Sequence, residues 1–154
     1  VNTEFLKKLP DQQERESLKK LDYQVFISAE ADEQWGFVGS KSNQRWLWYI
    51  LEKQTRKVIA FTFGPRSDGT FKKLLGLFDQ CKIDRIDTDD WGAYNRVWFR
   101  PIHRIGKAFT WRIERKNLDL RTRIKRLNRR TIGFSKSEIV HDSVIGLFIN
   151  KYMF

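Results

Sequence analysis

The first half of the chain contains three apolar segments that are separated by short polar turns. The three expected strands cover residues 24–40, 45–52 and 57–63. Alternating apolar and polar side chains are typical of strands, and short turns join antiparallel neighbours. We expect a bulge near Asp32 and a turn at Ser40–Asn43. Gly64-Pro65 ends the third segment, so the pattern predicts three antiparallel strands.

The hydrophobic period changes after Ser67. Apolar side chains then recur at the helical spacing i, i+3, i+4 and i+7, at Phe71, Leu74, Leu75 and Phe78. Ser67 or Asp68 is the expected N-cap of this helix. The elements expected next are a strand over 82–88, a brief helix or turn over 91–98 and a short fifth strand over 101–106.

Two further helices are expected in the last third of the chain. Residues 110–129 contain the longest helical pattern, with an apolar seam at Ile113, Leu120, Ile124 and Leu127. Ser135–Glu138 has the pattern of a capping box, which predicts the start of a last helix. That helix is expected to bury Val140, Val144, Leu147 and Phe148. The order β-β-β-α-β-(α)-β-α-α predicts an α/β fold, a mixed sheet with helices on both faces.

Length and composition favour one folded domain. A chain of 154 residues fits one compact unit, and 40% apolar with 14% aromatic residues argues against intrinsic disorder. We expect the domain over 23–154 and a polar helical arm or linker over 1–22. Because the chain begins with Val1 and not with Met, we expect either a fragment or a processed form. The lone Cys81 excludes a disulfide framework. No apolar run approaches the roughly 18 residues of a membrane span.

The positive charge is concentrated in one segment. The formal net charge is +11, and residues 104–136 carry twelve basic against two acidic residues, a net +10. Such a block attracts polyanions by releasing counterions, and arginine is well suited to phosphate. A solvated charged helix is the simpler alternative, but the acids that would form compensating pairs along it are few. The distribution therefore favours nucleic-acid binding.

The candidate metal ligands are carboxylates. With two His and one Cys in the chain, a metal site needs oxygen ligands, which favours Mg²⁺ or Mn²⁺. The three acids best placed to converge are Asp32 within the first strand, Asp89 after the strand 82–88, and Glu114 beside the apolar seam. Each alone is more often a solvated turn residue or a partner of the helix dipole. Other acids in the same segments compete with them: Glu30, Glu33, Asp87 and Asp90.

Four blocks of the sequence resemble one known family. They read AEADEQWGFVGSKSNQRWLWY, DTDDW, HRIGKAFTWRIERKNLDLR and GFSKSEIVHDSVIG. In order and spacing they are similar to transposases of the insertion sequence one group, in the frame that encodes the catalytic part. The resemblance covers roughly residues 28–150. It implies a ribonuclease-H-like domain with an Asp-Asp-Glu metal triad, and the predicted element order agrees with that fold.

The resemblance assigns roles to individual residues. The triad corresponds to Asp32, Asp89 and Glu114, and Asp90 stands where relatives often have Gly, which leaves it as an alternative to Asp89. The family's basic position seven residues after the Glu is Arg121 here, on the same helix face as Glu114. The basic residues expected to contact DNA, from the resemblance and the charge pattern together, are His103, Lys107, Arg112, Arg115, Lys116, Arg121, Arg123, Lys125 and Arg129.

The function implied by the resemblance is DNA transposition. Two divalent ions held by the triad would support hydrolysis at transposon ends and strand transfer to target DNA. The implied partners are DNA and further copies of the chain, in the bacterial cytoplasm close to the nucleoid, and the family's upstream DNA-recognition part has no counterpart in this sequence. The alternatives are a DNA-binding protein of the same fold without activity, a structure-selective nuclease, and a basic structural protein.

The aromatic side chains are expected mainly in the core. The tryptophans considered are Trp35, Trp46, Trp48, Trp91 and Trp111. Trp91, next to Asp89, is the best candidate to stack on a distorted DNA end. Tyr49 and Tyr94 are expected to be packing residues.

Overall fold

A five-stranded mixed sheet forms the centre of the molecule. The computed structural model describes residues 27–77, 83–97 and 103–154. The strands are β1 (Ile27–Val38), β2 (Ser40–Glu52), β3 (Val58–Gly64), β4 (Ile83–Thr88) and β5 (His103–Ile105). Their order is β3-β2-β1-β4-β5, with β1, β2 and β3 antiparallel and with β4 and β5 parallel to β1. The predicted mixed sheet is confirmed, while the predicted arm over 1–22 lies outside the described residues.

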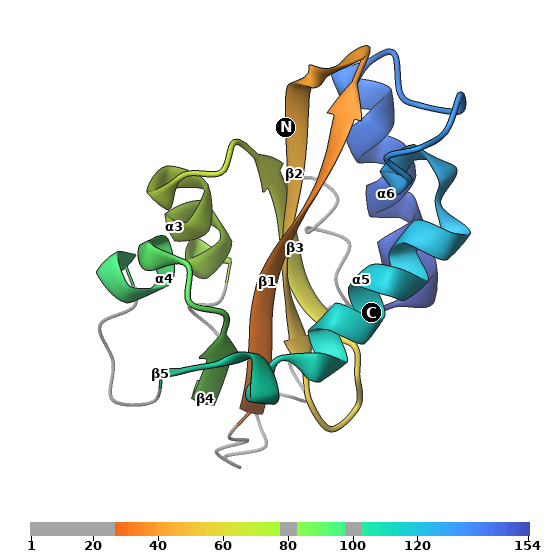
Figure 1. The fold of residues 1–154 in the computed structure, drawn as a ribbon. Helices are drawn as coiled ribbons and strands as arrows, with labels where there is room; N and C mark the ends of the chain where they lie inside the picture. Colours follow the sequence, from red (N-terminus) through yellow and green to blue (C-terminus); the bar gives the residue numbers. More distant parts are fainter. Residues whose placement is uncertain (1–26, 78–82, 98–102) are drawn as a thin grey trace.

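Helices cover both faces of the sheet. One face carries α3 (Asp68–Gly76) and α4 (Gly92–Val97), and the other carries α5 (Trp111–Arg123) and α6 (Glu138–Tyr152), as Figure 1 shows. Two short 3₁₀ turns, η1 (Lys107–Phe109) and η2 (Lys125–Leu127), flank α5. Ser67 is the N-cap of α3, because its side chain accepts a hydrogen bond from the backbone N–H of Thr70. The prediction of helices on both faces of the sheet is confirmed.

Each layer buries its own apolar cluster. The cluster under α5 and α6 includes Leu47, Tyr49, Phe61, Ile113, Leu120, Ile124, Leu127, Ile145 and Ile149. The cluster under α3 and α4 includes Ala29, Ala31, Trp48, Ile50, Phe71, Leu74, Ile86 and Tyr94. Alternate residues of β2 thus point into opposite clusters, as the period of a strand requires. No helix in the described ranges combines the length and apolar character that crossing a bilayer demands.

The hairpin between β1 and β2 is tighter than predicted. Gly39 has φ +76°, a conformation that glycine adopts without steric cost, and Val38 pairs directly with Ser40. The predicted turn at Ser40–Asn43 is therefore wrong, since these residues begin β2. The predicted bulge near Asp32 is also wrong. Asp32 pairs with Tyr49 in an uninterrupted ladder, and the irregularity lies between Phe37 and Val38.

The helix predicted over 110–129 is shorter in the structure. α5 ends at Arg123, and Ile124 takes an extended conformation with φ −113° and ψ 101°. This residue redirects the chain toward β1, so that η2 packs against the strand and Leu127 still reaches the core. The four predicted seam residues are all buried, although one continuous helix does not carry them.

The predictions for α6 need two corrections. Ser137, and not Ser135, is the N-cap, because Ser135 pairs with Val38 and forms a hydrogen bond of 2.6 Å with His141 Nδ1. The buried face of α6 consists of His141, Asp142, Ile145, Gly146 and Ile149. Val140, Val144 and Leu147, predicted to be buried, are 45%, 39% and 54% exposed, and only Phe148 packs against the core. The two polar residues face inward because each has a partner there: Ser135 for His141 and Arg45 for Asp142.

Candidate functional site

Asp32 lies in β1, and Asp89 follows directly after the neighbouring strand β4. β1 and β4 pair in parallel register, with Glu30 beside Asp87. Continuing this register by two residues brings Asp32 next to Asp89, where β4 has just ended. Asp89 Oδ1 accepts the backbone N–H of Trp91 at 3.0 Å, which orients the carboxylate at the start of α4. Two acids therefore meet at the carboxyl end of a parallel strand, where α/β folds commonly bind ligands.

The Asp32 carboxylate is hydrogen-bonded through both of its oxygens. Oδ1 accepts the backbone N–H of Glu33 at 2.9 Å, and Oδ2 accepts Nδ2 of Asn117 at 2.6 Å. Burial, followed by the negative charges of Glu33 and Asp89, raises the pKa of Asp32 to about 7. The ionised form of Asp32 is therefore disfavoured by its surroundings, and a nearby cation would stabilise it.

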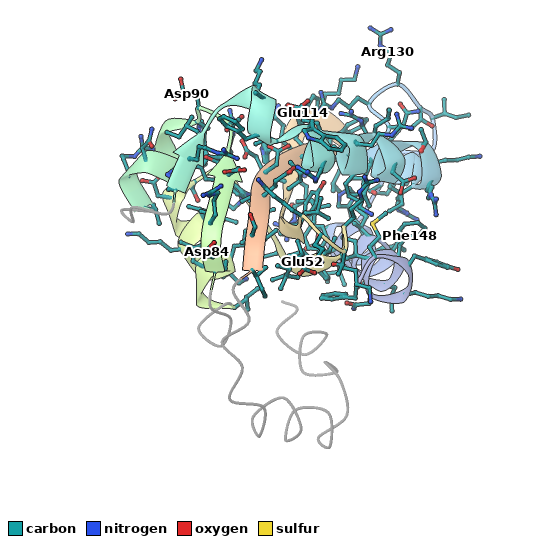
Figure 2. All side chains as sticks on the ribbon, turned by 90° about the horizontal axis from the view of Figure 1, so that it is seen from below. Glu52, Asp84, Asp90, Glu114, Arg130 and Phe148 are labelled. Atoms are coloured by element: carbon teal, nitrogen blue, oxygen red, sulfur yellow. The ribbon has the colours of Figure 1, made fainter. Side chains whose placement is uncertain are left out.

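Helix α5 is fixed to β1 by a buried acid. Glu30 is fully buried, and its carboxylate accepts the backbone N–H of Ile113 at 2.7 Å and the Arg112 side chain at 3.2 Å. A carboxylate at this position satisfies one of the unpaired N–H groups at a helix N-terminus. The contact places the first turn of α5, which contains Glu114, against β1 (Figure 2).

Glu114 is more exposed than the two aspartates. Its Oε1 lies 3.5 Å from the Thr110 hydroxyl, within the same helical turn. In the described ranges, no three His, Cys, Asp or Glu side chains are grouped closely enough to hold a metal ion. Glu114 shares its helix face with Asn117, which contacts Asp32. The assignment of Asp32, Asp89 and Glu114 as metal ligands stays a prediction.

Three of the four competing acids, Glu30, Glu33 and Asp87, have basic partners. Glu33 is bound by Arg66 at 2.6 Å, and Tyr94 also donates to it. Asp87 is bound by Arg104 at 2.8 Å and by Lys53, and Glu30 is bound by Arg112. Asp32, Asp89, Asp90 and Glu114 form no ion pair with any residue that the structure describes. Carboxylate oxygens are the ligands that Mg²⁺ and Mn²⁺ prefer, and binding of either ion here stays a prediction.

Asp90 differs from Asp89 in its surroundings. Its side chain projects from the surface, as Figure 2 shows, and the residue is exposed. Asp89, in contrast, is half-buried, and its charge acts on both Asp32 and Glu33. The geometry favours Asp89 over Asp90 as the partner of Asp32.

The basic residues expected to contact DNA fall into two groups. Four are engaged within the fold: His103 with the Thr88 hydroxyl, Arg112 with Glu30, Arg123 with Asp119, and Arg129 over the Trp35 ring. Burial lowers the pKa of His103, which favours its neutral form. Five others form no ion pair within the described part of the chain: Lys107, Arg115, Lys116, Arg121 and Lys125. DNA contact by either group stays a prediction.

The tryptophans are only partly core residues. Trp48 is fully buried, and Trp91 packs on it with ring centroids 5.2 Å apart. Arg66 lies over Trp91, at 4.6 Å from the ring centroid, and over Trp46 at 5.0 Å. Trp111 is 47% exposed, so its expected place in the core is wrong. Its ring lies near the guanidinium groups of Arg56 and Arg112, which keep it at the surface of α5.

Two polar residues of the site were not expected from the sequence. Asn117 was not singled out, and Tyr49 was expected only to pack, yet the Tyr49 hydroxyl donates to Asn117 Oδ1 at 2.8 Å. A signal for Asn117 exists, because it lies four residues after Ile113 and three before Leu120 in the seam of α5. A polar residue at such a position is normally hydrogen-bonded inside the protein.

The fold defines a class. Three antiparallel strands followed by two parallel strands, with helices on both faces, form a ribonuclease-H-like domain. A solved structure, the simian T-cell lymphotropic virus intasome in complex with PP2A regulatory subunit B56 gamma, has a similar chain with a TM-score of 0.52 and 14% identity. The match covers 85% of this chain and 51% of that chain, so the present chain spans about half of it.

The family is shown by closer relatives. The chain belongs to the IS1 transposase family, whose model matches residues 25–154. It is 55% identical over 128 residues to the insertion element iso-IS1n protein InsB of Shigella dysenteriae, covering 83% of this chain and 98% of the relative. It is 43% identical over 126 residues to the insertion element IS1 protein InsB of Shigella flexneri, covering 82% and 96%. The resemblance seen in the sequence blocks is thereby confirmed.

Proposed function

We propose that this chain is the catalytic domain of a DNA transposase, which hydrolyses phosphodiester bonds at transposon ends and joins the freed 3′ ends to target DNA. The observation that carries this proposal is the β1–β4 register, which, continued two residues past Glu30 and Asp87, directs Asp32 and Asp89 to the same edge of the sheet. Neither acid has an ion-pair partner in the described residues. A binding protein without activity gains nothing from two such acids, because adjacent like charges destabilise a fold unless something compensates them.

Asp32, Asp89 and Glu114 are the residues that would hold Mg²⁺ or Mn²⁺. When bound, these ions supply activation of the attacking oxygen and compensation of charge on the phosphate. Glu30 contributes by anchoring α5, which sets the position of Glu114 relative to the sheet. Arg121 follows Glu114 by two helical turns and is available to contact a substrate phosphate beside the acids.

The wider basic surface would hold the DNA backbone. α5 and the segment that follows it carry most of the excess positive charge, and backbone contacts of this kind position a duplex without reading its sequence. Because transposition joins two ends, the working form would be a dimer or larger, acting on DNA in the cytoplasm.

Cleavage and joining of labelled DNA test the proposal. The purified chain is incubated with labelled DNA ends and a circular target, with Mg²⁺, Mn²⁺ or a chelator. Asp89→Asn is the test variant and Asp90→Asn the matched control, since the two acids are neighbours. We expect metal-dependent cutting and joining by the wild type and by the control, and neither by Asp89→Asn.

The outcomes separate the alternatives. Cutting without joining would identify a nuclease. Binding without either reaction would identify a DNA-binding protein of this fold. Equal activity of Asp89→Asn and the wild type would remove Asp89 from the site.

A further inference from the structure

A chain of hydrogen bonds connects the second strand to the candidate ligand Asp32. The hydroxyl of Tyr49 donates to Asn117 Oδ1 at 2.8 Å, and Asn117 Nδ2 donates to Asp32 Oδ2 at 2.6 Å. Tyr49 lies directly opposite Asp32 in the β1–β2 ladder, so Asn117 of α5 spans the two strands from above. Tyr49 is fully buried and Asn117 is 8% exposed.

The direction of the Asn117 amide is set by Asp32. An ionised Asp32 only accepts, so the amide must present its NH₂ group to Asp32 and its oxygen to Tyr49. The Tyr49 hydroxyl can donate to that oxygen, and it also lies 3.2 Å from the carbonyl oxygen of Ile113. Reversing the amide would turn its oxygen toward the carboxylate and lose the bond to Asp32. The Tyr49 hydroxyl fits either direction, because it can accept from the amide and donate to the Ile113 carbonyl oxygen instead. The ionised Asp32 carboxylate therefore selects the observed orientation.

We propose that Asn117 is a positioning residue of the reaction, which holds the Asp32 carboxylate in its ligand orientation, and that Tyr49 holds Asn117. The inference rests on the proposed function, because it concerns how the Asp32 site is built. Asn117 is three residues after Glu114 on one helix face, so the same contact sets the spacing between the strand with Asp32 and the turn with Glu114. Residues that orient ligands in this way contribute to metal affinity without touching the metal.

A structural role alone would give a different result. Loss of a buried hydrogen bond would lower thermal stability and leave the folded protein's chemistry intact. A positioning role predicts a change in kcat and in metal affinity while the KM for DNA stays the same, because Asn117 is buried beneath the site and offers DNA no surface.

The test compares Asn117→Ala and Tyr49→Phe with Asn150→Ala, an asparagine change on α6 away from Asp32. For each folded variant, Mn²⁺ binding is measured by calorimetry without DNA, and kcat and KM are measured for cleavage. We expect Asn117→Ala to lose about 10- to 100-fold in Mn²⁺ affinity and in kcat. KM for DNA should stay within about twofold. Tyr49→Phe should show a smaller loss of the same kind, and Asn150→Ala none.

The outcomes distinguish this inference from the proposed function. If the wild type binds Mn²⁺ and cuts DNA while Asn117→Ala matches it in affinity and kcat, the positioning role is overturned and the proposed function stands. If Asn117→Ala loses only thermal stability, the role is structural and the inference fails. If the wild type neither binds Mn²⁺ nor cuts, the proposed function fails and the inference fails with it.

Discussion

The Glu30 carboxylate accepts a hydrogen bond of 2.7 Å from the backbone N–H of Ile113, across the boundary between the central strand and helix α5. The acid belongs to the sheet and the amide to the first turn of a helix more than eighty residues later. This bond joins the two elements that carry Asp32 and Glu114.

Removing the Glu30 side chain should destabilise the whole domain. Glu30→Ala leaves the Ile113 N–H and the Arg112 guanidinium without their buried partner, at a cost of about 2–4 kcal/mol in the free energy of unfolding. Urea denaturation followed by circular dichroism measures the change. Glu30→Gln keeps an acceptor and should cost less, and Asp84→Ala, an exposed acid of β4, should cost almost nothing. Equal losses for Glu30→Ala and Asp84→Ala would contradict the role given to this contact.

The free energy of unfolding should decrease as the pH is lowered, because His141 is buried as a neutral ring. Burial lowers its pKa to about 4, below the ordinary 6.5, so the folded protein keeps this ring neutral where the unfolded chain protonates it. The unfolded state binds more protons between these two values, and stability is therefore lost as the pH falls from 6.5 toward 4, by roughly 2–3 kcal/mol. Unfolding at a series of pH values should give a flatter dependence in His141→Asn than in the wild type. The same slope in both proteins would argue against a neutral buried ring.

A methyl group at Gly64 should be poorly tolerated. A Cβ at this position would lie 2.7 Å from the Thr70 hydroxyl and 2.8 Å from its methyl carbon, where β3 meets the start of α3. Because the Thr70 side chain is short and is hydrogen-bonded to the N-cap Ser67, the backbone must shift, and Gly64→Ala should cost about 1–3 kcal/mol.

Gly76→Ala is the matched control for that change. Apart from its chain neighbours and its own helix backbone, no atom of the described residues lies within 4 Å of its Cβ position. Because the residue is in α3, alanine should stabilise by about 0.5–1 kcal/mol. Thermal denaturation of the two variants should therefore give shifts of opposite sign. A lower melting temperature for both would show that α3 packs differently from the description above.

Neutralising the basic end of α5 should weaken the salt dependence of DNA binding. The change is Arg121→Gln with Arg123→Gln and Lys125→Gln, and the control is Lys72→Gln with Lys73→Gln on α3, on the other face of the sheet. The slope of log K against log salt should fall by about 2–3 in the first variant. Fluorescence anisotropy with a labelled duplex gives the slopes. An unchanged slope in the first variant would place the DNA elsewhere.

Much of the fold could be predicted because strand and helix periods are strong in this chain. The seam of α5 was identified correctly because Ile113 and Leu120 are apolar residues in a polar surrounding. α6 misled the same reasoning because apolar residues occur on both of its sides, and its inner side includes the polar residues His141 and Asp142. A hydrophobicity pattern contains no information on the buried partners Ser135 and Arg45, which allow these two polar residues to face inward.

The sequence pointed to the acids of the candidate site, but not to the residues that hold those acids in position. Asp32 and Asp89 were named from the resemblance, and their role as ligands stays a prediction. The register of β1 with β4, continued by two residues, directs both to the same edge of the sheet. Glu30 and Asn117 act through contacts with residues eighty or more positions away, and no local pattern encodes such pairs. The sequence can name the residues that resemble ligands, but only the fold shows which residues hold them.

Strand β1 and helix α5 run in the same direction, and residues further along the strand contact residues further along the helix. Glu30 meets Ile113 and Asp32 meets Asn117, so two strand residues match four helix residues. Two residues of a strand rise about 6.6 Å and four of a helix about 6 Å, which is why the match holds over successive contacts. A one-residue insertion or deletion between Glu30 and Asp32, or between Ile113 and Asn117, would misalign the second contact with respect to the first. The exposed turn at 54–57 takes part in neither contact and should tolerate changes in length. Among functional proteins with this domain, insertions and deletions should therefore occur in the turns and not in these two stretches of β1 and α5.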